Sequence, residues 1–164
     1  MKRILLVLST TRYSHASVTH AIDEARELLV EGPVSLRVLY IIETGELAKV
    51  RSSIDGDGWL GSKPQSQVID ALARQHHKTA RHRIRRARKL AKQLEGLVLT
   101  VDEVEGEYVD TASEAALLGD VDRVFMTRAD KPFITRFLFG SDAETVARLV
   151  RDRGGQVVID DHIV

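Results

Sequence analysis

A glycine–serine pair near the end of the chain has the residue types of an anion site. Gly140-Ser141 precedes Glu144, and a serine followed three residues later by glutamate is the pattern that caps a helix start. The free backbone N–H groups and the dipole of such a helix start attract phosphate. Arg128 and Lys131 in the preceding segment could neutralise the anion. The alternative is a plain helix cap, which Glu144 already explains, with solvated cations beside it.

No residue set for catalysis or for metal binding stands out. The chain has no cysteine, no Gly-x-Ser-x-Gly turn for a serine nucleophile, and no Walker or Gly-x-Gly-x-x-Gly loop. His76 and His77 point about 100° apart on a helix, and no carboxylate or cysteine stands at ligand spacing. The segment Asp55-Gly-Asp-Gly58 places Ser66 where a calcium loop needs glutamate. We therefore expect neither enzyme activity nor a bound metal.

Apolar runs and helical patterns alternate along the whole chain. Strict alternation predicts an α/β fold with one doubly wound, five-stranded parallel sheet in a single domain over residues 1–164. Ligands of such sheets bind at the carboxyl ends of the strands, which brings segments 9–12 and 127–130 to the candidate site. The predicted strands cover 3–9, 34–42, 97–104, 121–127 and 156–159, and the predicted helices cover 15–30, 67–94, a short segment from Thr111, and 141–153.

Local sequence patterns also mark two further features, the start of the third predicted helix and the long connection before the second. Thr111 and Glu114 form another capping pattern, so the third helix is expected to begin there. The polar connection over 43–65 is long for a compact domain, and loops of that length are usually functional or mobile.

The charge of the chain is balanced overall but unevenly distributed. Nine of the 24 Lys and Arg residues lie in segment 71–94, which has no acid, so the rest carries 15 bases and 24 acids. A helix of this kind could bind the phosphates of nucleic acid. It lacks aromatic residues for stacking and any recognition motif. We therefore favour a solvated face, or one complementary to an acidic surface or a second subunit, and expect no nucleic-acid partner.

The apolar start of the chain is better explained by a strand than by a targeting signal. The run 4–8 is short for a signal peptide, and the polar segment 9–12 follows at once. No segment approaches the roughly 18 apolar residues of a membrane span. The absence of cysteine fits a reducing compartment. We expect a cytoplasmic protein without membrane contact.

The order and spacing of these segments resemble the universal stress protein family over nearly the full length. The resemblance implies a Rossmann-like sheet with strand order 3-2-1-4-5 and a regulatory role in stress response. It rests on the strand 2–9 with Ala21 in the next helix, on the strand 34–42 with its long loop and long helix, on segment 121–127, and on Phe137-Leu-Phe-Gly-Ser141 with the helix and strand that follow.

The chain departs from the ATP-binding members that it resembles. Those members carry glycine, two residues, glycine, nine residues and Gly-Ser or Gly-Thr, and counting back from Gly140 places Asp130 and Thr127 at the two glycines. A side chain there keeps phosphate from the backbone, and a carboxylate repels it. Ser9 also replaces the common aspartate. We expect no ATP and no other cofactor.

Two alternatives to a regulatory module without ATP stay open. The first is a nucleotide or anion sensor in the cleft between the first and fourth strands, and the second is the basic helix as a binder of nucleic acid or an acidic partner. The sensor would use Ser9, Thr127, Arg128, Lys131, Gly140 and Ser141.

The last predicted strand is a candidate for self-association. It contains Val157, Val158 and Ile159 without lysine or proline, and an unprotected apolar edge is a template for pairing with another chain. The family resemblance implies a two-fold homodimer through this strand. A separate protein partner is also compatible with the sequence.

Overall fold

The computed structural model describes residues 1–45, 48–49, 51–52, 62–129 and 142–161. Within these residues, five parallel strands form one sheet in the order β3-β2-β1-β4-β5. This order confirms the predicted α/β fold. The strands are β1 (Lys2–Ser9), β2 (Val34–Glu43), β3 (Leu97–Gly106), β4 (Arg123–Thr127) and β5 (Gln156–Asp160), and the helices are α1 (His15–Leu29), α3 (Ser62–Ala91), α4 (Tyr108–Leu118) and α6 (Asp142–Arg151).

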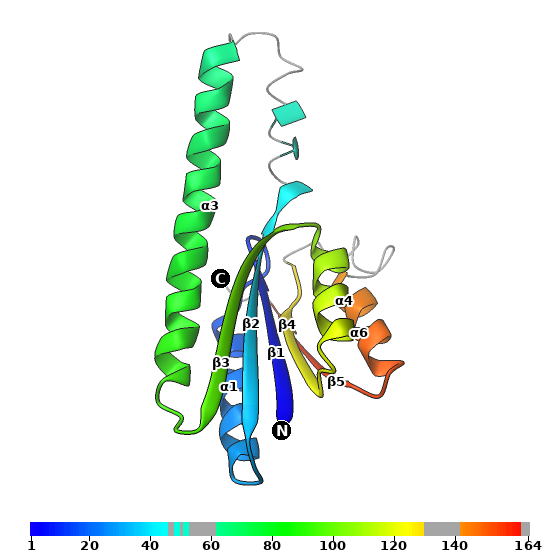
Figure 1. Cartoon of the computed structure of the whole chain (residues 1–164). Coiled ribbons are helices and arrows are strands. Elements are labelled where there is room, and N and C mark those ends of the chain that lie inside the picture. Colours follow the sequence, from blue (N-terminus) through cyan, green and yellow to red (C-terminus); the bar gives the residue numbers. More distant parts are fainter. Residues whose placement is uncertain (46–47, 50, 53–61, 130–141, 162–164) are drawn as a thin grey trace.

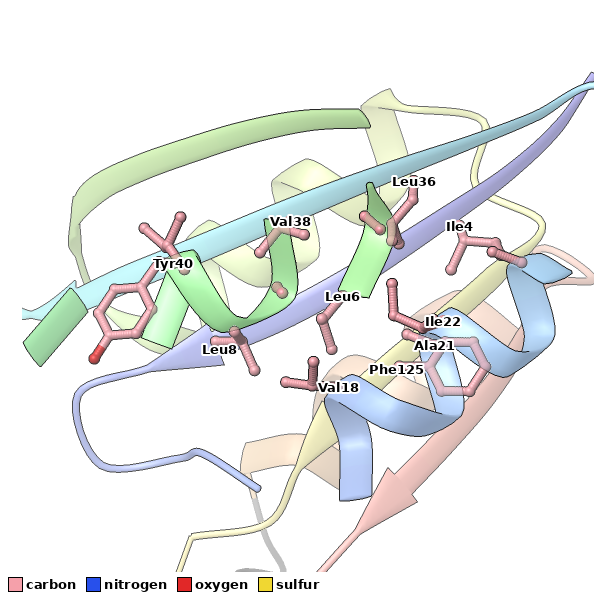
Figure 2. Packing of buried hydrophobic residues seen from close by; sticks show 14 of the residues in the cluster. Ile4, Leu6, Leu8, Val18, Ala21, Ile22, Leu36, Val38, Tyr40 and Phe125 are labelled. Atoms are coloured by element: carbon pink, nitrogen blue, oxygen red, sulfur yellow. The ribbon is translucent and has the colours of Figure 1, made fainter. Parts of the chain in front are cut away.

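Helices cover both faces of the sheet, which explains the almost unbroken apolar runs of the central strands. Side chains alternate across a strand. Ile4, Leu6 and Leu8 therefore pack with α1 and α3 (Figure 2), whereas Leu5 and Val7 pack with α4 and α6. The carboxyl ends of all strands lie at one edge of the sheet, because every strand runs in the same direction.

The predicted start of the third helix is wrong. Helix α4 begins at Tyr108, with Glu107 as its N-cap residue, and the backbone N–H of Thr111 already donates to the Glu107 carbonyl at 3.0 Å. The physical reason is tertiary, because Tyr108 is 3% exposed and its burial fixes the first turn. A local capping pattern has no information about that burial.

Helix α3 is longer than predicted and is only partly supported by the sheet. It begins at Ser62 instead of residue 67. Ala80, Ile84, Ala87 and Ala91 are buried against the sheet, as the helical spacing predicted. In Figure 1 the part of α3 before them rises past the carboxyl ends of the strands. Among the described residues, no helix combines the length and the apolar character needed to cross a bilayer.

Candidate functional site

A buried ion cluster around Arg12 occupies the carboxyl ends of β1 and β2. The Arg12 side chain is only 5% exposed, and its Nη1 donates to Glu43 Oε2 at 2.5 Å while its Nη2 donates to Asp142. The guanidinium carbon lies 4.1 Å from the centre of the Tyr108 ring. Arg12 therefore connects the end of β2, the start of α4 and the start of α6.

Glu43 is the acceptor at the centre of this cluster. Its Oε1 accepts hydrogen bonds from the hydroxyls of Ser9 and Thr11, the latter at 2.7 Å, in addition to the bond from Arg12 to Oε2. Burial alone would raise the pKa of Glu43, but the hydrogen bonds from Arg12, Ser9 and Thr11 outweigh it and hold the pKa below its ordinary value. The carboxylate is therefore ionised at neutral pH.

The surroundings of Arg12 and Tyr108 also determine whether these two side chains are charged. Burial opposes the charge of Arg12, but the hydrogen bond and the charge of Glu43 keep the pKa of Arg12 raised. Burial also raises the pKa of Tyr108, so its hydroxyl is neutral. Among the described residues, neither that hydroxyl nor Arg12 Nε has a hydrogen-bond partner. The cluster therefore contains one cation, Arg12, paired with the two carboxylates of Glu43 and Asp142.

Ser9 and Thr127, both predicted to face a ligand, are fully buried at the ends of β1 and β4. Their side chains have different partners, because Ser9 donates to Glu43 whereas Thr127 Oγ1 lies 2.7 Å from Ser17 Oγ on α1. The structure therefore brings the two strand ends to one edge without joining the two hydroxyls in one site.

Arg128, the predicted anion ligand after β4, is held by carboxylates. Its Nη2 lies 2.7 Å from Glu144 and its Nη1 lies 2.9 Å from Asp161. The hydrogen bond to Glu144 is the main reason that the pKa of Arg128 is raised. These contacts neutralise the cation that the sequence assigned to a phosphate.

The other residues predicted for this loop are not placed. Lys131, Gly140 and Ser141, together with Asp130 and the segment 55–58, lie outside the described residues.

A hollow of about 590 Å³ adjoins the ion cluster and has an acidic lining. Its acidic residues are Glu43, Glu107, Asp110 and Asp142, against the bases Arg12 and Lys49. Phosphate is disfavoured beside an excess of carboxylates. The described residues hold no group of three or more His, Asp or Glu side chains arranged for a metal ion.

The predicted dimer strand β5 lies at one edge of the sheet. Val158 is 39% exposed, whereas Val157 and Ile159 pack partly against the core beneath α4 and α6. The three residues therefore differ in solvent exposure, and Val158 is the one with a substantial exposed surface.

The fold and the positions of its elements agree with a known family. The model of the universal stress protein family matches residues 1–151. The chain belongs to the universal stress protein family. No curated protein matches it significantly.

Several solved structures share the fold of this member at low sequence identity. UspA from Lactobacillus plantarum is 15% identical, with a TM-score of 0.65 and 97% of each chain covered. The hypothetical protein MJ0577 is 14% identical, with a TM-score of 0.66 over 99% of this chain and 96% of the other. A universal stress protein in complex with cAMP is 16% identical, with a TM-score of 0.55 over 98% and 96%.

Segment 9–12 was predicted to lie at the ligand edge, but neither Arg12 nor Glu43 was predicted to be a site residue. Two signals were available, namely an acid as the last residue of an apolar strand and an arginine three residues after another strand. Neither signal identifies Asp142 or Tyr108 as the partners, because those contacts depend on the folded arrangement.

Proposed function

We propose that this universal stress protein is a non-catalytic, homodimeric regulatory module that acts without binding ATP. The observation that carries the proposal is the Arg12–Glu43–Asp142 cluster at the ligand edge of the sheet. Nucleotides of doubly wound sheets bind at this edge. A triphosphate here would meet Glu43 and Asp142, while the cation that could balance its charge is already held by both.

The proposed dimer uses β5. Strand β5 forms one edge of the sheet, and Val158 is exposed on this strand. An edge strand has unpaired N–H and C=O groups that a symmetry-related copy can pair with. A two-fold contact of this kind places Val158 near its own counterpart.

A second candidate function is the sensing of a smaller nucleotide in the same cleft. It is favoured by one relative, the universal stress protein in complex with cAMP. A cyclic monophosphate carries one negative charge, so it meets less repulsion from Glu43 and Asp142 than a triphosphate does.

Isothermal titration calorimetry with ATP and with cAMP tests both candidates. We expect no ATP dissociation constant below about 1 mM, which corresponds to roughly −4 kcal/mol. A micromolar constant for ATP would refute the proposal, and a micromolar constant for cAMP alone would favour the second candidate. If the missing glycines are the cause, Thr127→Gly combined with Asp130→Gly raises the affinity for ATP.

A further inference from the structure

A second hollow, of about 770 Å³, lies between α3 and the segment that leads into α1. We call it the basic groove. Its lining includes no acidic residue and five Lys or Arg side chains, which are Lys78, Arg83, Arg85, Arg86 and Lys89. The groove belongs to the face of the sheet covered by α1 and α3, whereas the Arg12 cluster contacts α4 and α6. The two sites are therefore separate.

The cations of the basic groove are not neutralised by the protein. Lys78, Arg85, Arg86 and Lys89 are exposed, and none of them forms an ion pair within the described part of the chain. Arg12 and Arg128, by contrast, each bind two carboxylates. Unpaired Lys and Arg gathered on one face are the electrostatic signature of a surface that binds phosphates.

Arg83 is fixed in position at the side of the basic groove. Its Nη1 donates to the carbonyls of Ser9 at 2.8 Å and Thr10 at 3.0 Å, and to the hydroxyl of Tyr40 at 3.1 Å. Its guanidinium carbon lies 4.5 Å from the centre of the Tyr13 ring. All these bonds use Nη1, so the N–H groups of Nη2 and Nε have no partner among the described residues. An arginine held in this way loses little entropy when it binds an anion.

The cations also have a linear arrangement. Lys78, Arg85 and Lys89 follow one side of a helix, and the rise of about 1.5 Å per residue separates the first from the last by roughly 16 Å. A compact anion would need convergent cations, whereas a row of them fits phosphates spaced along a chain. The Tyr13 ring is 8% exposed and lies against Arg83, so it is not available to stack on a base.

We infer that the basic groove binds a linear phosphate chain, either the phosphodiester backbone of nucleic acid or a polyphosphate, without reading bases. The sequence alone favoured a solvated face because the helix has no aromatic residue. The folded structure adds three observations that the sequence does not give, namely the groove itself, the absence of ion pairs at its cations among the described residues and the fixed position of Arg83. This binding is independent of whether the protein binds ATP or forms a dimer.

Fluorescence anisotropy of the full chain tests the inference with two probes, a labelled thymidine 15-mer and a labelled inorganic polyphosphate of similar charge. The groove variant is Arg86→Gln with Lys89→Gln. The control variant is Arg81→Gln with Arg88→Gln, which changes the same charge on the same helix but beside Val101 and Glu103 of β3. Circular dichroism melts check that both variants remain folded.

We expect the groove variant to bind about 25-fold more weakly at 0.1 M salt, with the slope of log K against log salt reduced by about 1.4, as two lost contacts to a single strand predict. The control should change the affinity less than threefold. Binding of the oligonucleotide alone, of polyphosphate alone, or of both identifies the source of the phosphate chain. Equal losses in the two variants, or no binding of either probe at 0.1 M salt, would disprove the inference.

Discussion

Arg12 and Asp142 are separated by 130 positions in the sequence and form a direct salt bridge at the ligand edge of the sheet. With Glu43 on its other nitrogen, Arg12 has two anionic partners from its own chain. In this universal stress protein, Arg12 thus occupies the cleft where a phosphate-binding group would be expected. Its charge is already paired with two carboxylates of the protein.

Replacing Arg12 with methionine should destabilise the protein by roughly 3–5 kcal/mol, because it leaves the Glu43 carboxylate buried without its cation. The double variant Arg12→Met with Glu43→Gln should recover a large part of that loss. Urea unfolding followed by circular dichroism measures both. The matched control is Arg37→Met, because the Arg37 side chain is 40% exposed in its pair with Asp102 and should contribute at most about 1 kcal/mol. Equal losses at Arg12 and Arg37 would show that the cluster contributes no special stability.

Glu43 should make the stability of the protein depend on acid pH. Its pKa is lowered in the folded state, so its stabilising contribution is complete above the ordinary value of 4.5 and is lost as the pH falls through the lower folded value. Urea midpoints between pH 7 and pH 3 should therefore fall less steeply below pH 4.5 for Glu43→Gln than for the wild type. Parallel curves for the two proteins would assign the acid sensitivity to other carboxylates.

The alternation of strands and helices was predictable from local patterns and the order of the strands from the family resemblance, while the ion cluster was not predictable from either. The runs of β1 and β2 are almost wholly apolar, and the helical spacing of Ala80, Ile84 and Ala87 is a local pattern. Arg12 and Glu43 lie after separate strands, so their contact depends on the register that pairs Ser9 with Ile41. The start of α4 was missed for the same reason, since the burial of Tyr108 is decided by the folded sheet.

Asp142→Asn should increase the affinity of the cleft for phosphate ligands about tenfold, or 1.4 kcal/mol, because it removes a negative charge and releases Arg12 Nη2. Asp110→Asn is the control. Asp110 lines the same hollow and its replacement changes the same charge, but it forms no ion pair with Arg12 among the described residues. Calorimetry with ATP and with sulfate measures both variants. A similar gain at Asp110 would attribute the effect to net charge instead of Arg12.

Val158→Lys should break the proposed dimer, since it places like charges near each other across the two-fold axis of β5. Val158→Pro should do the same by removing a backbone donor. Val98→Lys is the control on β3, the opposite edge strand, where Val98 is 54% exposed. Light scattering at tens of micromolar protein gives the mass of each variant. A monomeric wild type, or a dimer that is lost only at Val98, would move the interface away from β5.

The length of α3 has a consequence for local opening of the native protein. No residue from Ser66 to Gln75 is buried, and the first buried side chain of the described helix is His76. Isolated helices shorter than about 12–15 residues are marginal in water. The amide protons of this segment should therefore exchange with solvent much faster than those beside Ala80 and Ala87, while the sheet stays folded. The two parts of this continuous helix thus differ in local stability. The outer part can unwind while the part packed on the sheet, and the core beneath it, stay folded.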